Sequence, residues 1–169
     1  MRKSLKPVQQ TEKVMTSKLT IESLKRKNFG ANEFIHSDTA NRLGIDNNVY
    51  SDNTLVCLMK VADKVQEIRD KIGVPVSITS GYRCVDLNKA VGGSAGSKHI
   101  QGLGIDCNAK GFTQDAFVRW IKASGISVDK CFVERGCVHM QFCLNDDHNK
   151  NYFGTAEKIG KHWIVKELK

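Results

Sequence analysis

Three residues in two short stretches of the chain have metal-binding side chains at a spacing that can form one site. His99 and Asp106 lie seven residues apart, and His139 follows in a later stretch, residues 137–142. Zinc binds histidine nitrogen and carboxylate oxygen in a tetrahedral shell, and a catalytic zinc keeps three protein ligands and one position open for water. The spacing therefore predicts a single zinc ion bound by these three residues. The other three histidines of the sequence lack neighbours of this kind.

A zinc site that hydrolyses a bond also needs a general base for the attacking water. If residues 135–136 form a two-residue turn, Glu134 pairs with Cys137 across a hairpin. Glu134 then lies diagonally from His139 at about 7–8 Å, a distance that a glutamate can bridge to a metal-bound water. Glu134 is therefore the predicted catalytic base. The alternative is a charge at the hairpin edge that pairs with Arg135.

Two further polar residues are candidates for binding the substrate. Arg83 lies at the end of a predicted strand, where it could clamp a substrate carboxylate or stabilise a developing oxyanion, so that it would be both catalytic and substrate-binding. Its alternative role is a structural ion pair with Asp86 or another acid. Ser97 lies two residues before His99, where its hydroxyl either hydrogen-bonds the substrate or caps the loop.

The periodicity of apolar residues predicts the elements that must position these side chains. A helix of about five turns is expected from an N-cap at Asp52 or Asn53 to residue 72, and Gly73 and Pro75 end it. The other expected helices cover residues 86–91 and 114–124, with a short one starting near residue 37. The expected strands cover residues 76–80, 103–108, 131–134 and 137–143, with a further strand near residues 163–165.

Alternation along two of these strands determines where the predicted ligands point. In the stretch 103–108, Asp106 lies on the face opposite the apolar residues, and His139 does the same in the stretch 137–143. Gly102 and Gly104 allow the backbone to approach closely where the loop carrying His99 meets the strand. The loop can therefore bend towards the two other ligands.

Length and composition limit the classes of protein to which the chain can belong. Its 169 residues suffice for one compact domain, and no linker or repeat divides them. No apolar run reaches the roughly 18 residues of a membrane span, and the N-terminus has no signal-peptide pattern, so synthesis in a bacterial host cytoplasm without export is expected. In that setting the six cysteines are expected to be mostly free thiols.

The positive charge is concentrated at the N-terminus. The net charge is +8, and residues 1–27 contribute +6 of it, with eight Lys or Arg against Glu12 and Glu22. We expect these residues to form a solvated basic arm that precedes a domain at residues 28–169. The alternative is an electrostatic attachment to an anionic polymer, either nucleic acid or a bacterial wall. No aromatic residue is interleaved in the arm, so nucleic acid is the weaker option.

Four motifs, in this order, resemble a known family. They are Ser80-Gly-Tyr-Arg83, Leu87-Asn-Lys-Ala-Val-Gly-Gly93, Ser97-x-His99-x-x-Gly102-x-x-x-Asp106 and Val138-His139-x-x-Phe142. The sequence resembles the zinc D-alanyl-D-alanine carboxypeptidase family, which also contains phage endolysin L-alanyl-D-glutamate peptidases and shares its fold with the hedgehog signalling domain. The likeness covers about residues 28–143.

The resemblance implies a fold and a site. The fold would be a single α+β domain with a small, mostly antiparallel sheet and helices packed on one side. Carried over by position, the resemblance implies one zinc ion on His99, Asp106 and His139, with Arg83 and Ser97 in the substrate site.

Three positions depart from the family pattern. Gly104 stands where the family often has alanine, which costs little because both residues are small. Cys137 stands where a tryptophan commonly precedes the Val-His pair, and it could alter a substrate wall or offer zinc a soft sulfur ligand. Several members have a carboxylate three residues before the last histidine, where this chain has Gly136. Glu134 must then supply the base. If Glu134 did not reach the site, the protein would bind zinc without hydrolysing anything.

Three functional hypotheses follow from these residues. The first is a zinc peptidase that cuts a peptide bond of the peptidoglycan stem. The short chain and its basic arm favour a monomeric bacteriophage enzyme of this kind, acting on the wall after release at lysis or from the virion. The second hypothesis is a zinc-stabilised, non-catalytic binding or virion structural module of the same fold. The third is a thiol enzyme that uses Cys137 with a histidine.

Overall fold

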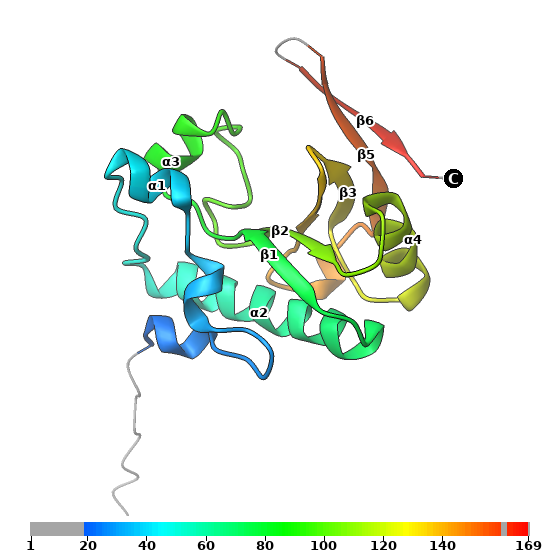
Figure 1. The fold of residues 1–169 in the computed structure, drawn as a ribbon, viewed down its shortest axis with the longest axis horizontal. Coiled ribbons are helices and arrows are strands. Elements are labelled where there is room, and N and C mark those ends of the chain that lie inside the picture. The colour runs from blue at the N-terminus through cyan, green and yellow to red at the C-terminus, as the bar shows by residue number, and fades with distance from the viewer. Residues whose placement is uncertain (1–18, 160–161, 169) are drawn as a thin grey trace, which may run out of the picture.

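Six strands form one sheet in the computed structural model, which describes residues 19–159 and 162–168 (Figure 1). The strands are β1 (Val76–Ser80), β2 (Gly104–Ala109), β3 (Lys130–Glu134), β4 (Cys137–Gln141), β5 (Tyr152–Ile159) and β6 (His162–Glu167), in the spatial order β1-β2-β4-β3-β5-β6. Neighbouring strands are antiparallel except for β3 and β5, which are parallel. The predicted α+β domain with a mostly antiparallel sheet is confirmed.

The described part of the chain also contains four α-helices. They are α1 (Asp38–Leu43), α2 (Asp52–Ile72), α3 (Val85–Ala90) and α4 (Gln114–Ser124), and short 3-10 turns cover Ile21–Leu24, Ala31–Phe34 and Asp146–His148. The side chain of Ser51 caps α2 by accepting a hydrogen bond from the N–H of Thr54, and Gly73 ends the helix in a left-handed conformation. The sequence predicts this helix correctly but places its N-cap one or two residues too late. None of the helices in the described ranges has the length and apolarity that crossing a membrane requires.

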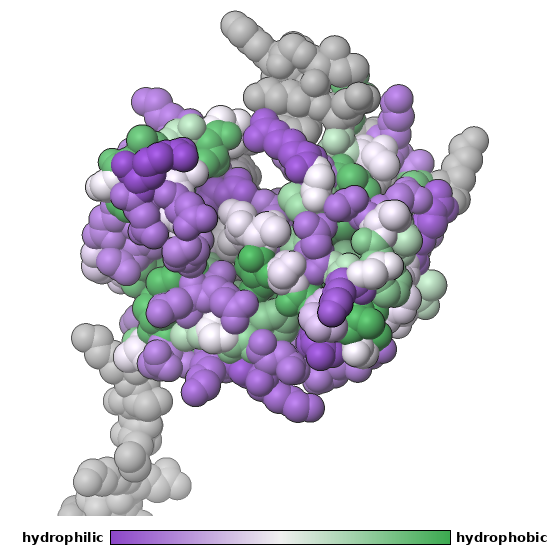
Figure 2. Space-filling model, in the orientation of Figure 1, coloured by the Kyte–Doolittle hydropathy of each residue, from purple (hydrophilic) through white to green (hydrophobic). Residues whose placement is uncertain are grey.

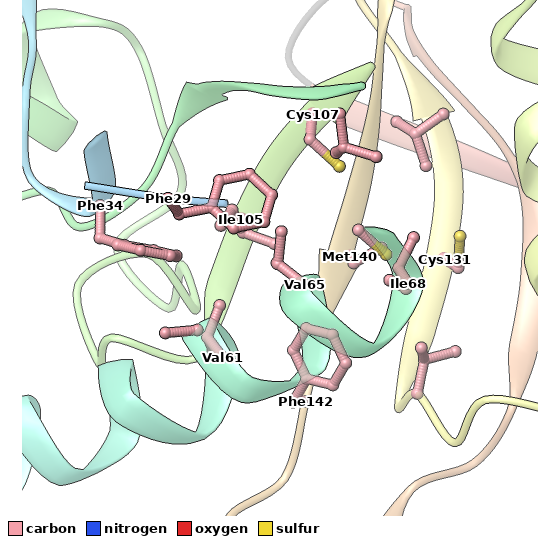
Figure 3. Close-up of a cluster of buried hydrophobic side chains, with 14 of the residues drawn as sticks. Phe29, Phe34, Val61, Val65, Ile68, Ile105, Cys107, Cys131, Met140 and Phe142 are labelled. Atoms are coloured by element: carbon pink, nitrogen blue, oxygen red, sulfur yellow. The ribbon is translucent and has the colours of Figure 1, made fainter. Parts of the chain in front are cut away.

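The hydrophobic core lies between one face of the sheet and the helices α2 and α4. Val61 and Val65 of α2 belong to the same buried cluster as Ile105 of β2 and Met140 of β4 (Figure 3). Phe117 of α4 is fully buried in this cluster. Because side chains alternate along a strand, the residues between these core positions point to the opposite face of the sheet. That opposite face carries the predicted site.

A tight turn joins β3 to β4. Arg135 (φ 48°) and Gly136 (φ 81°) both have positive φ, as a type I′ hairpin turn requires. The register pairs Glu134 with Cys137 across the two strands. The predicted two-residue hairpin is therefore confirmed. Its pairing places Glu134 on the same face of the sheet as His139, two residues after Cys137.

β5 is the strand that the sequence does not predict. Gly154 interrupts its apolar pattern, and a glycine inside a strand weakens the sequence signal. The strand forms through long-range pairing with β3 on one side and β6 on the other, and Phe153 is buried in the core. β5 and β6 extend from the sheet as a hairpin, and β6 contains the strand predicted near residues 163–165 (Figure 1).

The N-terminal segment is partly built into the domain. Residues 1–18 of the predicted basic arm lie outside the described residues. Residues 19–27, by contrast, pack on the domain: Leu24 is fully buried, and Arg26 forms an ion pair at 2.6 Å with Asp63 of α2. These residues belong to the folded domain and not to a free arm.

Candidate active site

The three predicted metal ligands converge on one point. His99 Nε2 lies 3.2 Å from His139 Nδ1 and 3.3 Å from Asp106 Oδ1, and the last two atoms are 2.7 Å apart. Ligand atoms at about 2.0–2.1 Å from a tetrahedral zinc lie about 3.3 Å from one another. The three residues therefore form a buried group that fits a zinc ion on one face of its coordination shell.

The sheet and one loop hydrogen bond orient these side chains. Asp106 and His139 are register partners on the adjacent strands β2 and β4, and both point to the face opposite the core. His99 comes from the loop before β2 and is 2% exposed. Its Nδ1 donates a hydrogen bond at 2.6 Å to the carbonyl oxygen of Gly81, which leaves the Nε2 lone pair directed at the other two residues.

Gly104 lets the loop lie directly on β2. A Cβ atom at this position would lie 2.8 Å from the backbone nitrogen of His99, closer than real contacts allow. The close approach expected from the sequence is thus present. This close approach places the His99 ring next to Asp106, which follows Gly104 by two residues on β2.

Arg83 forms an ion pair with a predicted ligand. Its Nη2 donates to Asp106 Oδ2 at 2.6 Å, and its Nε donates to Ser80 Oγ at 2.8 Å. The acid partner in this ion pair is Asp106 and not Asp86. Arg83 therefore holds one carboxylate oxygen while the other oxygen faces the two histidines, and no hydrogen bond within the described residues occupies its Nη1.

Asp106 is held in the carboxylate form. Burial by itself raises the pKa of Asp106, but the interactions of its carboxylate with His139 and His99 outweigh that effect and hold the pKa well below its ordinary value. An ionised carboxylate beside two histidine nitrogens is a donor set that zinc binds readily.

The metal-binding group opens into a cavity of about 310 Å³. Arg83, Ser97 and Glu134 line this cavity together with the three metal-binding residues. The surface is hollowed between the part of the molecule that carries α3 and the β5–β6 hairpin, and hydrophilic residues border the hollow (Figure 2). All six residues singled out in the sequence thus share one cavity. This cavity is large enough to hold a short peptide segment.

A family model described as Peptidase M15 matches residues 27–141, which is more than half of the chain. The chain belongs to the peptidase M15 family. This is the family of zinc D-alanyl-D-alanine carboxypeptidases and endolysins that the motifs resemble. Membership supports a zinc metallopeptidase that acts on peptidoglycan-like substrates. No curated protein matches the chain.

Ser97 of this M15 domain has the loop-capping role that was one of its two expected roles. Its Oγ accepts a hydrogen bond at 3.3 Å from the backbone N–H of His99, which caps the turn before the ligand. The same residue lines the cavity, so its hydroxyl can also donate to a bound molecule. Capping and substrate binding are compatible here because a hydroxyl both accepts and donates.

Three of the further residues that line the M15 cavity lie on β3 and β4 and were missed in the sequence. Phe132 lies beside His139 with a distance of 4.9 Å between the ring centroids. Lys130 and Gln141 form the next register pair on the same face of the two strands. The signal that could have found them is alternation, because Lys130 and Phe132 share a face of β3 with Glu134.

The hairpin turn that carries Glu134 is held from two sides. The carbonyl oxygen of Gly136 accepts hydrogen bonds from Gln114 Nε2 at 2.9 Å and from Asn108 Nδ2 at 3.4 Å. Gln114 is the first residue of α4 and Asn108 belongs to β2. Helix α4 and strand β2 therefore fix the position of the turn next to Glu134.

Cys137 is placed poorly for either of the roles considered for it. Among the described residues, the group that could hold a metal consists of His99, Asp106 and His139 and does not include this thiol. Its Sγ donates at 3.0 Å to the carbonyl oxygen of Glu134. Burial, followed by the negative charges of Asp106 and Glu134, raises the pKa of the Cys137 thiol to about 12. All six cysteines are free, as expected from the sequence.

Cys137 is therefore expected to resist alkylation in the native protein. With its pKa at about 12 instead of 9, the thiolate fraction at pH 8 falls about a thousandfold, and the thiolate is the reactive form. Iodoacetamide treatment followed by peptide mass spectrometry measures this, and the unfolded protein is the control. Rapid labelling of native Cys137 with a parallel loss of hydrolysis would favour the thiol-enzyme hypothesis instead.

Proposed function

We propose that the chain is a zinc-dependent peptidase that hydrolyses a peptide bond of the peptidoglycan stem and serves a bacteriophage in degrading the cell wall. Membership of the M15 family supports the peptidase class and its peptidoglycan-like substrates. The observation that carries the proposal is the group His99, Asp106 and His139, whose three ligand atoms face the cavity that Glu134 also lines. The enzyme would act as a monomer, after lysis or from the virion.

In this proposal His99, Asp106 and His139 would hold one zinc ion through Nε2, Oδ1 and Nδ1. When bound, zinc would activate a water molecule and polarise the scissile carbonyl group. Glu134 takes the proton of the attacking water on its carboxylate and later gives that proton to the leaving amine nitrogen.

Arg83 and Ser97 serve the substrate in this proposal. Arg83 lines the cavity and is already fixed by Asp106 and Ser80, so binding a substrate group costs it little further side-chain entropy. It can bind a substrate carboxylate or the oxygen that becomes negative during attack. Ser97 can donate its hydroxyl hydrogen to a substrate carbonyl.

Hydrolysis of purified sacculi tests the proposed function directly. Protein loaded with one equivalent of zinc is expected to release soluble muropeptides and new amine termini, and chelation followed by zinc addition should remove and restore that release. Mass assignment of products from defined muropeptides then identifies the cleaved bond. Stoichiometric zinc binding without any new amine termini would exclude the proposal.

The second candidate is a zinc-stabilised, non-catalytic module of the same fold, which would bind wall material or form part of a virion. Gly136 favours it, because this position lacks the carboxylate that several family members have three residues before the last histidine. Glu134 is not one of the three residues whose ligand atoms lie close enough together to bind one metal ion. Zinc binding with wall binding and no hydrolysis would be its signature.

A further inference from the structure

Strand β3 presents a row of three residues to the cavity. Lys130, Phe132 and Glu134 alternate along the strand and all line the cavity. In the register with β4, Phe132 lies opposite His139, so Lys130 and Glu134 flank this residue on opposite sides. Their Cα atoms are about 13 Å apart along the strand. The row therefore places a cation at one end, the predicted base at the other end and an aromatic ring between them.

Lys130 is a cation of this cavity without an acidic partner among the described residues. Its half-buried side chain forms neither an ion pair nor a hydrogen bond within the described residues. Arg83, by contrast, is paired with Asp106, and Lys98 donates to Gln101 Oε1 at 3.0 Å. A partly desolvated ammonium group without a counter-charge gains most from binding an anion.

The neighbour of Lys130 fits the same ligand. Gln141 is its register partner on β4 and also lines the cavity, so its amide can donate a second hydrogen bond to an anion at this end. Lys130 lies diagonally from His139, at about 7–8 Å across the two strands. An extended peptide advances about 3.3 Å per residue, so this end of the row lies about two residues from the cleaved bond.

We propose that Lys130, assisted by Gln141, determines specificity by binding a free carboxylate of the peptide substrate within about two residues of the cleaved bond. The inference rests on the proposed function and names the substrate class of that site: peptides with an ionised carboxyl group at this position, in preference to the carboxamides. Phe132 supports the peptide chain between this carboxylate and the reacting carbonyl.

Peptide analogues that differ by one carboxyl group test the proposal. The substrates are a defined stem pentapeptide, which contains both the L-alanyl-D-glutamate bond and the D-alanyl-D-alanine bond, as the free acid and the same peptide with each carboxyl group amidated in turn. For the wild type, amidation of one particular carboxyl group is expected to lower kcat/KM about 10- to 100-fold, mainly through KM. In Lys130→Met, kcat/KM for the free acid should fall by a similar factor, and amidation of that carboxyl group should lower it no further. Lys130→Glu should favour the amide.

The matched control is Lys110→Met, because Lys110 is an exposed lysine after β2 that does not line the cavity. It should keep the wild-type ratio of acid to amide. A Lys130→Met variant that retains the full wild-type ratio would overturn the proposal, and so would a wild type that ignores amidation at every position.

A binding measurement separates this proposal from the proposed function. If the zinc-loaded wild type cleaves none of these peptides, the peptidase proposal fails. Calorimetric titration with the same acid and amide peptides then tests whether Lys130 binds a carboxylate. Tighter binding of one acid than of its amide, lost in Lys130→Met and kept in Lys110→Met, supports the carboxylate site. Equal binding of acid and amide by the wild type rejects it.

Discussion

Replacement of Glu134 by glutamine is expected to lower the rate of peptide hydrolysis by about 10²- to 10⁴-fold while the protein keeps its zinc. Glutamine preserves the size of the side chain but cannot accept the proton of the attacking water or pass it to the leaving amine. Glu134 lies outside the group of His99, Asp106 and His139, so its change leaves the metal-binding atoms in place. Product release from muropeptides and zinc content by atomic emission are the two measurements.

Glu67→Gln is the matched control for this change. Glu67 lies on α2, where it pairs with Lys71 at 2.9 Å, and it does not line the cavity. Its replacement should leave hydrolysis unchanged. Full activity in Glu134→Gln would show that another group is the base. If neither the wild type nor this variant hydrolyses peptides although both bind zinc, the non-catalytic module is the better description.

Replacement of His139 by alanine is expected to abolish both stoichiometric zinc binding and the stabilisation that zinc provides. The change removes one of the three ligand atoms that lie 2.7–3.3 Å apart. A ligand that binds only the native state stabilises it by about 4 kcal/mol when present at a thousand times its Kd. For a domain of this size, that corresponds to a rise in Tm of roughly 10 °C. The wild type should show this rise on zinc addition, and His139→Ala should not.

His148→Ala is the control for the ligand change. His148 lies in an exposed 3-10 turn and is not part of the metal-binding group. This variant should keep the zinc-dependent rise in Tm and the zinc stoichiometry of the wild type. An equal response of His139→Ala and the wild type to zinc would contradict the metal site as assigned.

The sequence by itself determined the local elements and the faces of the two ligand-bearing strands. The 21-residue helix α2, the strands β2 and β4 and the hairpin at residues 135–136 follow from apolar periodicity and from a turn that tolerates positive φ. The same alternation places Asp106 and His139 opposite the apolar side chains. These properties are readable because they depend on residues that are close together in the sequence.

The tertiary structure decided which polar groups meet. Arg83 pairs with Asp106, 23 residues away, and no local pattern distinguishes this acid from Asp86. The strand β5 forms through parallel pairing with β3, and Lys130 faces the cavity without an acidic partner among the described residues. Such pairings depend on how distant strands and loops pack, so each polar group takes the partner that the fold brings within reach. The sequence supplied the candidates for a zinc peptidase, and packing assembled them around one cavity.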